Sequence, residues 1–268
     1  MTRTANDDYL WFCEHLLAKT GLDLKQYKRP QMERRLRSMA ERAGARDLQE
    51  YWAVLEKDAR QFAYFIDRIT INVSELFRNP EKFDELRRVI LPELRRLGSP
   101  LKVWSAGCSY GAEPYSLAIL LEEMRPLQYH ILATDVDETI LNKAREGYFA
   151  PEDMRNVSAE WRQRYFIQQD NRYQVKPELK RNISFRKHNL LADPFDSGFH
   201  LIVCRNVVIY FNEEAKDRLY ARFFQSLVPG GVLFVGSTER IFNYRDIGFE
   251  MPLSFFYRKP MYGVRKAA

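Results

Sequence analysis

The segment from Leu101 to Leu141 constrains the fold more than any other part of the chain, because two apolar strands in it each end in a turn that can hold a ligand. Its first part, LKVWSAGCSYGAEPYS, is typical of a strand, a glycine turn and a helix, and the later ILATDVDETIL is typical of a strand, an acidic turn and a helix. The pattern predicts two consecutive units of a parallel α/β sheet, in which ligands bind beyond the carboxyl ends of the strands.

The two turns predict a nucleoside cofactor without phosphates. Gly107 and Gly111 let the backbone approach a ligand closely, and Asp135 stands where a carboxylate can accept hydrogen bonds from both ribose hydroxyls. The GxxxG spacing differs from the GxGxxG of pyrophosphate-binding turns, and no Walker lysine follows. S-adenosylmethionine fits, since it combines adenine, a ribose diol and a zwitterionic tail. An ordinary α/β crossover with a glycine turn is the alternative.

Composition limits the class of protein. The chain has 268 residues, 46% of them hydrophobic, and can bury the core of one large domain or two. No apolar run approaches the ~18 residues of a membrane span, and the N-terminus has no signal-type apolar core. Cys13, Cys108 and Cys204 are widely separated, with no second ligand at metal spacing. We therefore expect a cytoplasmic protein without membrane insertion or a metal site. We also expect it to be a monomer.

The net charge of +6 comes from residues 25–46, which contain eight Lys and Arg against two Glu. Within this range Met32, Leu36, Met39 and Ala43 recur at helical spacing, which predicts one buried stripe. We expect four arginines on the exposed side to bind a partner: Arg34, Arg35, Arg37 and Arg42. A solvated helix face is the alternative, but the charge excess favours an acidic partner, either nucleic acid or an acidic protein helix.

The remaining patterns predict the order of secondary structure. The first 70 or so residues are helical in pattern, and a further helix runs from Asn79-Pro80 to about Leu97. After that, strands and helices alternate, as in a mostly parallel sheet with helices on both faces. Strands are expected at 101–106, 130–134, 183–187, 199–204 and 231–236, with helices starting near Pro114, Glu138 and Asn212. The segment from Phe249 to Arg258 is expected to add an antiparallel edge strand.

Residues 161–187 interrupt the alternation. Two short β-like pieces, 164–167 and 172–175, are joined by the turn-forming sequence QDN, which predicts a small antiparallel β-subdomain. We therefore expect a basic helical domain with its linker at 1–78, an α/β domain at 79–268, and the β-subdomain at 161–187 within it.

Polar residues near the strand ends are candidates for the ligand site. Glu113 opens the helix after the glycine turn, where its carboxylate can cap the helix or hold an ammonium group. Asn189 can pair with an adenine edge through its amide, and Leu190 can pack against the ring. Arg205 and Asn206 interrupt an apolar run, and because unpartnered burial of such groups is costly, we expect them to face the site.

Two further groups of polar residues complete the candidate site. Tyr210 lies in the same run, VCRNVVIYF, as the Arg-Asn pair. The junction ITINVSELFRNPE contributes Asn72, Ser74 and Arg78, at a place where two domains can close over a ligand.

Four motifs, ITINVSELFRNP, GCSYGAEPYS, ATDVDETIL and CRNVVIYF, make the chain similar to the chemotaxis receptor methyltransferases of the CheR type. The resemblance covers nearly the whole chain. It implies an α/β fold of the class I S-adenosylmethionine-dependent methyltransferases, with a Rossmann-like, mostly parallel sheet, a preceding all-α domain and a small antiparallel β-subdomain. It also implies methyl transfer to glutamate side chains on the cytoplasmic helical bundle of chemoreceptors, with S-adenosylhomocysteine as product.

The resemblance gives roles to residues that match its motifs. Asn72, Ser74 and Arg78 would bind the cofactor or shape the catalytic site, with Arg78 on the carboxylate tail. Tyr210 would lie near the transferred methyl, and Arg78 and Tyr210 are the expected catalytic residues. The other expected cofactor-binding residues are Gly107, Glu113 (amino group), Asp135 (ribose), Asn189 and Leu190 (adenine), and Arg205 and Asn206 (pocket wall).

The chain departs from the family pattern at three places. Ser74 stands where the family often has Thr, and Ala112 precedes Glu113 where another acid is common. The loop around Gln169 to Arg172 is short and lacks glycine, whereas members that dock on a receptor C-terminal pentapeptide have a longer loop with glycine. We therefore expect no pentapeptide tether.

The predicted chemistry agrees with the absence of a catalytic histidine motif. A glutamate carboxylate, with a pKa of roughly 4.3, is ionised at pH 7 and needs no general base. Arg78 has an alternative role as an interdomain salt bridge. Two other functions remain open: a nucleic-acid methyltransferase, for which no NPPY-type motif is present, and a non-catalytic module that binds S-adenosylmethionine.

Overall fold

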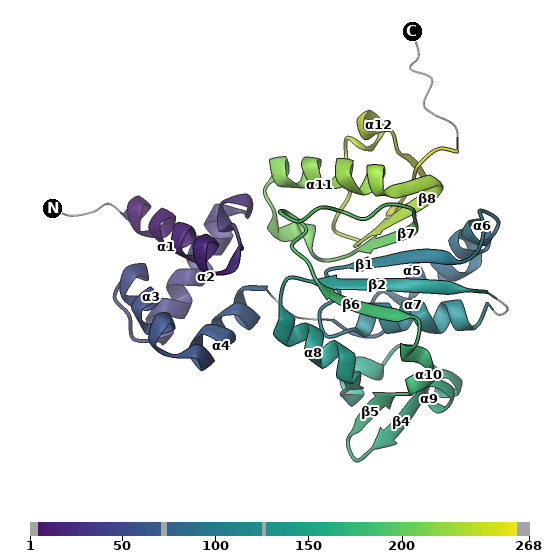
Figure 1. Cartoon of the computed structure of the whole chain (residues 1–268), viewed down its shortest axis with the longest axis horizontal. Coiled ribbons are helices and arrows are strands. Elements are labelled where there is room, and N and C mark those ends of the chain that lie inside the picture. Colours follow the sequence, from purple (N-terminus) through teal and green to yellow (C-terminus); the bar gives the residue numbers. More distant parts are fainter. Residues whose placement is uncertain (1–4, 71–73, 125–126, 262–268) are drawn as a thin grey trace, which may run out of the picture.

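The computed structural model describes residues 5–70, 74–124 and 127–261 and consists of a helical unit beside a larger α/β unit (Figure 1). The helical unit contains α1 (Ala5–Thr20), the 3-10 turn η1 (Leu24–Gln26), α2 (Arg29–Arg42), α3 (Leu48–Lys57) and α4 (Ala59–Thr70). Phe12 on α1 is fully buried and packs edge to face against Trp52 and Phe65, with ring centroids 5.3 and 5.8 Å apart. The helical unit therefore has a hydrophobic core of its own.

The stripe that α2 buries differs from the predicted one. Met32, Leu36 and Ala40 are buried and Met39 is half-buried, whereas Ala43 is exposed. Ala43 follows the last residue of α2, and the chain then turns at Gly44, with φ +76°, towards α3. The turn carries Ala43 away from the core, so the prediction was wrong at this position.

The α/β unit is built on a seven-stranded sheet with the order β6-β2-β1-β7-β8-β10-β9. Its strands are β1 (Leu101–Ala106), β2 (Tyr129–Asp135), β6 (Ile183–Lys187), β7 (Phe199–Cys204), β8 (Leu227–Val235), β9 (Glu250–Leu253) and β10 (Phe256–Arg258). The first five in spatial order are parallel, and β10 pairs antiparallel with β8 and β9. The single edge strand predicted at 249–258 is therefore a hairpin, with Phe255 at φ +75° in its turn.

Helices cover both faces of this sheet. They are α5 (Pro80–Glu85), the π turn η2 (Leu86–Ile90), α6 (Leu91–Arg95), α7 (Ala112–Glu122), α8 (Glu138–Glu146), η3 (Pro151–Met154), α9 (Ala159–Tyr165), α10 (Pro177–Lys180), η4 (Val208–Tyr210), α11 (Glu213–Ser226) and α12 (Tyr244–Ile247). Side chains alternate along β1, so Val103 packs in the cluster with α5 to α7 and Trp104 packs in the cluster with α11. Among the helices described, none is long and apolar enough to cross a membrane.

A second, three-stranded antiparallel sheet projects from the α/β unit (Figure 1). It has the order β3-β5-β4, with β3 at Tyr148–Phe149, β4 at Phe166–Gln169 and β5 at Arg172–Val175. The predicted range 161–187 needs correction at both ends. It omits β3, which is only two residues long, and it includes β6, which lies in the main sheet.

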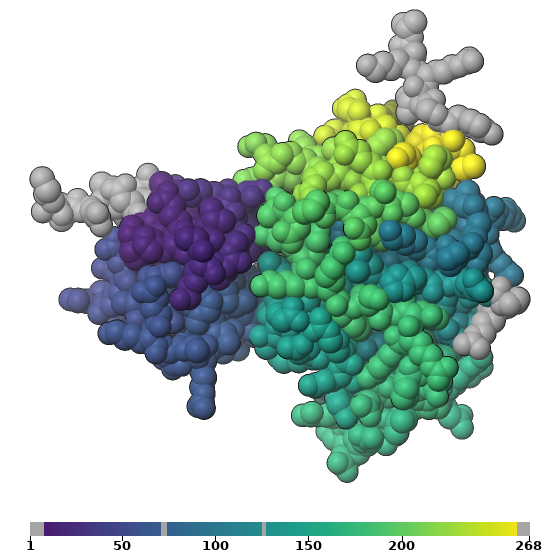
Figure 2. All heavy atoms as spheres, in the orientation of Figure 1, coloured from purple at the N-terminus to yellow at the C-terminus, as the bar shows by residue number. Residues whose placement is uncertain are grey.

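Backbone hydrogen bonds join the helical unit to the α/β unit. The N–H of Lys28, which precedes α2, donates to the carbonyl of Tyr210 at 2.9 Å, and Tyr27 forms an antiparallel bridge with Phe211. In Figure 2 the helical unit, in purple and blue, lies directly against the α/β unit. Because the segment that carries Tyr210 follows β7, these bonds hold the helical unit at the carboxyl ends of the central strands.

Candidate active site

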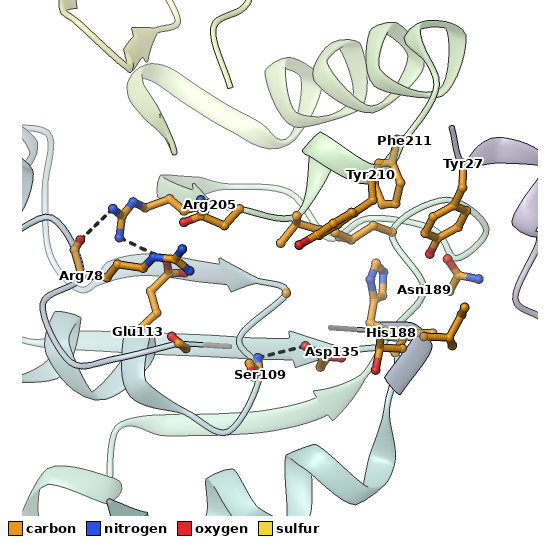
Figure 3. Close-up of a pocket in the computed structure, with 18 of the residues that line it drawn as sticks. Tyr27, Arg78, Ser109, Glu113, Asp135, His188, Asn189, Arg205, Tyr210 and Phe211 are labelled. Carbon is orange, nitrogen blue, oxygen red and sulfur yellow. Dashed lines mark hydrogen bonds and ion pairs between the residues drawn. The ribbon is translucent and has the colours of Figure 1, made fainter. Parts of the chain in front are cut away.

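A pocket lies beyond the carboxyl ends of β1, β2 and β7 and is bordered by both units (Figure 3). It brings together every predicted site residue of the α/β unit and its linker that the structure describes: Ser74, Arg78, Gly107, Glu113, Asp135, Asn189, Leu190, Arg205, Asn206 and Tyr210. Asn72 lies outside the described residues. The four predicted arginines of α2 do not line this pocket.

The glycine turn after β1 has no room for a side chain. Gly107 has φ +86°, and its N–H donates to the carbonyl of Thr134 at 2.8 Å. A Cβ on Gly107 would lie 2.4 Å from a methyl of Val207 in the loop after β7. Glycine therefore permits the turn and the loop to approach each other at the pocket wall.

Glu113 is a buried carboxylate in the first turn of α7. Its Oε1 accepts a hydrogen bond from the hydroxyl of Ser105 at 2.7 Å, and its Oε2 lies 3.9 Å from the guanidinium of Arg205. Burial raises the pKa of Glu113 to about 7, while the positive charges of Arg205 and Arg78 act in the opposite direction. A cationic group that entered the pocket would favour the ionised carboxylate further.

Arg205 connects the loop after β7 to the linker between the units. Its Nη2 donates to the carbonyl of Arg78 and to the side chain of Asn79, both at 2.8 Å. Its guanidinium lies over the rings of Phe83 and Phe234, 5.2 and 4.8 Å from their centroids. Arg205 thus fixes the backbone that carries Arg78, whose side chain lines the pocket.

Asp135, at the end of β2, holds the glycine turn in place. Its two carboxylate oxygens accept hydrogen bonds from the backbone N–H groups of Ser109, at 2.9 Å, and Asp137, at 3.1 Å. Burial raises the pKa of Asp135 to about 6. Each carboxylate oxygen can accept more than one hydrogen bond, so the pocket side of Asp135 remains available to a ligand.

Asn189 and Leu190 line the pocket, but the amide of Asn189 already has protein partners. Its Nδ2 donates to the carbonyl of Gly21 in the helical unit at 2.9 Å, and its Oδ1 accepts from the N–H of Leu191 at 3.0 Å. Leu190 is buried and gives the pocket an apolar wall. Pairing of the Asn189 amide with adenine therefore stays a prediction.

The sequence reasoning missed Glu239, which shapes the loop after β7. This buried carboxylate accepts hydrogen bonds from the N–H groups of Asn206 at 2.6 Å, Val208 at 3.0 Å and Gly236 at 2.8 Å. Asn206 has φ +59°, a left-handed conformation that these bonds support. Nothing in the motif around Glu239 marks it as a loop anchor, because its partners lie up to 33 residues away.

Aromatic residues that the sequence reasoning also missed form the far side of the pocket. Tyr27, His188 and Phe211 all line it, and the rings of Tyr27 and Phe211 lie edge to face at 5.1 Å. His188 is buried, and burial lowers its pKa, which favours the neutral ring. Tyr27 comes from the helical unit and Phe211 from the segment after η4, a proximity that only the tertiary fold produces.

A second cavity, which we call the basic groove, lies between α2 and α4. Its walls hold the five cationic residues Lys28, Arg34, Arg35, Arg42 and Arg68, together with Gln31, Met32, Ser38, Met39, Ala43, Tyr51, Gln61, Tyr64 and Tyr210. In the part of the chain that the structure describes, no Asp or Glu lines this groove.

Tyr210 borders both cavities. It lines the pocket and the basic groove, and its pKa is raised by burial and lowered by the charges of Arg35 in the groove and Arg78 in the pocket. The phenol therefore lies where the two cavities meet.

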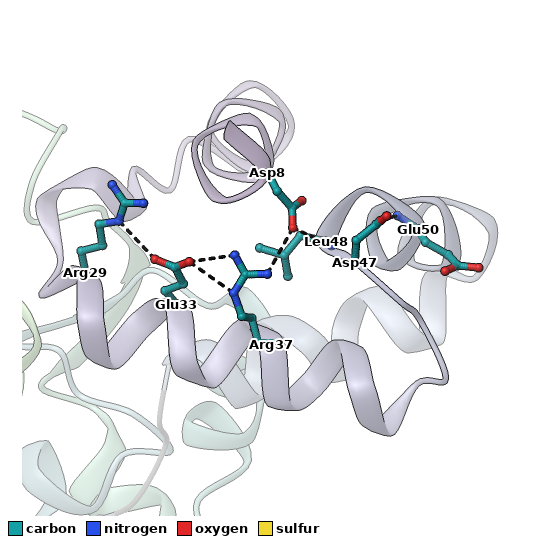
Figure 4. Close-up of polar contacts among 7 residues, drawn as sticks. All are labelled: Asp8, Arg29, Glu33, Arg37, Asp47, Leu48 and Glu50. Atoms are coloured by element: carbon teal, nitrogen blue, oxygen red, sulfur yellow. Dashed lines mark hydrogen bonds and ion pairs between the residues drawn. The ribbon is translucent and has the colours of Figure 1, made fainter. Parts of the chain in front are cut away.

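Arg37 has a structural role that differs from the prediction. Its guanidinium donates to Glu33 at 2.8 Å and to Asp8 on α1 at 3.2 Å, and Asp8 also accepts from the N–H of Leu48 on α3 (Figure 4). The Arg37–Asp8 pair therefore links α2 to α1, and Asp8 extends the link to α3. Arg37 does not line the basic groove. The other three predicted partner-binding arginines, Arg34, Arg35 and Arg42, do line it.

Comparisons with known proteins identify the family. The protein-family model described as "CheR methyltransferase, SAM binding domain" matches residues 72–252. A second family model, described as "CheR methyltransferase, all-alpha domain", matches residues 7–70. A chemotaxis protein methyltransferase of Listeria monocytogenes is 42% identical over 254 residues, which cover 94% of this chain and 97% of the relative. One of Salmonella typhimurium is 31% identical over 242 residues, covering 86% and 83%.

These matches span both units and agree with the pocket geometry, and they remove the nucleic-acid methyltransferase and the non-catalytic module as alternatives. The chain belongs to the CheR family of chemotaxis protein methyltransferases, enzymes that transfer a methyl group from S-adenosylmethionine to glutamate side chains of chemoreceptors.

Proposed function

We propose that the receptor glutamate enters through the basic groove and meets the methyl donor beside Tyr210. The observation that carries this proposal is the position of Tyr210, which borders both the pocket and the groove. The groove has five cationic residues and, in the described structure, no acidic ones. An acidic receptor helix is the partner that such a surface fits, since its carboxylates would neutralise the cationic walls.

The donor fits the pocket on the other side of Tyr210. Glu113, with a pKa raised to about 7 by burial, is suited to an ammonium group, which would favour its ionised form. We assign Arg78 to the carboxylate end of the donor and Asp135 to the ribose. Ser74 and Asn206 are proposed to complete the pocket, with Leu190 against the adenine. When bound, S-adenosylmethionine supplies a methyl group on a positively charged sulfur.

The enzyme's own residues act by positioning and by excluding water. The acceptor carboxylate is ionised at pH 7, so no residue has to remove a proton. Holding the carboxylate in line with the methyl at ~3 Å supplies several kcal/mol of the barrier as effective molarity. The hydroxyl of Tyr210 is placed to orient the acceptor. Tyr27 and Phe211 form a hydrophobic wall that keeps water from the site, where opposite charges are neutralised during transfer.

We further propose a division of labour along the chain. In residues 1–78 the helical unit recognises the receptor, and its linker contributes Ser74 and Arg78 to the donor pocket. Residues 79–268 bind the rest of the donor and carry out transfer, in a monomer in the cytoplasm. The β4–β5 turn is formed by Asp170 and Asn171 alone, with Asp170 at φ +48°. This short turn supports direct recognition of the methylation helices without a pentapeptide tether, so deleting a receptor C-terminus should leave methylation unchanged.

Charge reversal in the groove tests the route of the acceptor. We expect Arg34→Glu with Arg35→Glu to reduce kcat/KM for a receptor fragment at least tenfold, because two attractive contacts become repulsive. The dissociation constant for S-adenosylhomocysteine should not change. The matched control reverses two exposed arginines on α6 and just after it, Arg95→Glu with Arg96→Glu. Equal losses of kcat/KM in both double variants would show that the change in net charge alone causes the effect, and would contradict the proposed route.

The role of the Tyr210 hydroxyl is tested by Tyr210→Phe, which keeps the ring. We expect kcat to fall about tenfold or more, with the affinity for S-adenosylhomocysteine within twofold of the parent. If kcat and the affinity both keep their parent values, the hydroxyl does not orient the acceptor, and Tyr210 only packs between the two cavities.

A further inference from the structure

A polar face of α4 forms the wall of the basic groove that lies opposite α2. The sequence patterns did not predict a role for this face. Gln61, Tyr64 and Arg68 recur at intervals of three and four residues, so they lie on one side of the helix, and all three line the groove. Tyr64 is 56% exposed, and the guanidinium of Arg68 lies 5.1 Å from the centre of its ring. This contact limits the positions that the exposed Arg68 side chain adopts.

Arg68 and Arg35 present like charges to the same groove from two helices. Both line it, and within the described residues neither forms an ion pair with a carboxylate. By contrast, Arg37 on α2 pairs with Glu33 and Asp8. Burial lowers the pKa of Arg35, and the positive charge of Arg68 lowers it further. The two guanidinium groups therefore interact unfavourably until an anion lies between them.

A helix bound in the groove would present more than one side chain to it. Residues three, four or seven positions apart lie on one face of a helix, one or two turns of about 5.4 Å from each other. When the acceptor glutamate points towards Tyr210, a residue at one of these intervals therefore points into the groove. The unpaired guanidinium groups make a carboxylate the best partner at that position.

We propose that Arg35 and Arg68 together bind a second acidic residue of the receptor helix, one or two turns from the glutamate that is methylated. This inference rests on the proposed entry of the acceptor through the basic groove. It makes Arg68 a specificity-determining residue on α4, a helix outside the basic segment 25–46. It also means that glutamates with an acidic neighbour at this interval are methylated at lower receptor concentrations than glutamates without one.

The first experiment measures steady-state methylation of a receptor fragment by the full-length Arg68→Gln variant. The variant loses one partly desolvated ion pair between Arg68 and the receptor, so KM for the receptor should rise about threefold to tenfold. We expect kcat and the affinity for S-adenosylhomocysteine to remain within twofold of the parent. The matched control is Arg60→Gln, an exposed arginine on the same helix that does not line the groove. Equal changes in the two variants would overturn the inference.

The second experiment identifies the acidic partner on the receptor. Each Asp or Glu at three, four or seven positions from the methylated glutamate is replaced by the corresponding amide, and each receptor is assayed with the parent enzyme and with Arg68→Gln. At one position the two changes should be strongly non-additive, because either alone removes the same contact. Additive losses at every position would contradict a shared contact.

Arg35→Gln separates this inference from the proposal on which it rests. A raised receptor KM for both Arg35→Gln and Arg68→Gln supports both ideas. A raised KM for Arg35→Gln alone keeps the groove as the entry route and refutes the second acidic contact. Parent values for both variants refute the entry route as well.

Discussion

The backbone N–H of Lys28 donates to the carbonyl oxygen of Tyr210 at 2.9 Å, across the boundary between the helical and α/β units. Lys28 immediately precedes α2, and Tyr210 ends η4, where the pocket meets the basic groove. The neighbouring residues Tyr27 and Phe211 form an antiparallel bridge. The orientation of α2 and the position of the Tyr210 phenol are therefore set by the same contact.

Replacing Lys28 by proline tests this contact, because Lys28 has φ −63°, which proline adopts without strain. Lys28→Pro removes the N–H, whereas Lys28→Ala keeps it and removes the same side-chain charge. We expect the kcat/KM of Lys28→Pro for the receptor to be several-fold lower than that of Lys28→Ala, as one net hydrogen bond of about 1 kcal/mol is lost. The affinity for S-adenosylhomocysteine, measured by calorimetry, should be the same in both. Equal kcat/KM values would show that the contact does not position the site.

Asp135 is predicted to bind the donor, and its neighbour Asp137 provides the control. Asp135→Ala should weaken S-adenosylhomocysteine binding by about one to two orders of magnitude, as expected for a desolvated carboxylate that accepts two hydroxyls. Asp137 accepts from the N–H of Thr139 at 2.8 Å and caps α8. Asp137→Ala should therefore lower Tm while leaving affinity near the parent value. Unchanged affinity in Asp135→Ala would remove Asp135 from the donor site.

Donor binding should depend on pH through Glu113. Burial raises the pKa of this carboxyl group to about 7, and the ammonium group of the donor favours its ionised form. As the pH falls through 7 the protonated form accumulates, so affinity for S-adenosylhomocysteine should be about fourfold lower at pH 6.5 than at pH 8. Calorimetry in buffers of different ionisation enthalpy should detect release of about half a proton at pH 7. Glu113→Gln should bind weakly and without this dependence. A parent affinity that is flat over the same range would contradict the assignment.

Arg37 and Arg34 both belong to α2, but their replacement should affect different properties: stability for Arg37 and receptor binding for Arg34. Arg37 pairs with Asp8 and Glu33, so Arg37→Ala should lower Tm by about 2–4 °C, the effect of about 1 kcal/mol in a protein of this size. Its receptor KM should stay near the parent value. Arg34 lines the groove, and Arg34→Ala should raise receptor KM without changing Tm. Thermal unfolding combined with methylation kinetics distinguishes the two roles, and a reversed pattern would contradict the assignment.

Local patterns were sufficient to predict much of the fold. The strands at 101–106, 183–187 and 199–204 have the predicted bounds, and β2 extends one residue beyond its predicted range at each end. The strand β8 begins four residues before its predicted start at 231 and ends one residue before its predicted end at 236. Four of these strands, β1, β2, β7 and β8, contain apolar runs. The fifth, β6, has the sequence ISFRK, in which apolar and polar residues alternate, and it lies at the edge of the sheet. The strand β3 was not predicted, because two residues carry no periodicity and its pairing with β5 is set by tertiary contact.

The predicted pocket residues gather in one place because the carboxyl ends of parallel strands share one edge of the sheet. What the sequence could not reveal depends on distant partners. Arg37 was assigned to the exposed face because its partner Asp8 lies 29 residues away on another helix. Glu239 and Arg68 were overlooked for the same reason: their roles come from segments that only the fold brings near.

Site-specific cross-linking tests most directly whether the acceptor helix lies in the basic groove. Cys13, Cys108 and Cys204 are all buried, so a cysteine introduced at the groove residue Ser38 supplies the accessible thiol, with Ala53→Cys on the exposed face of α3 as control. The receptor fragment carries one cysteine a turn away from the methylated glutamate. We predict a disulfide between Ser38→Cys and the receptor that forms much faster than with Ala53→Cys and that S-adenosylhomocysteine does not prevent. Equal rates for the two variants would contradict entry of the acceptor through the groove.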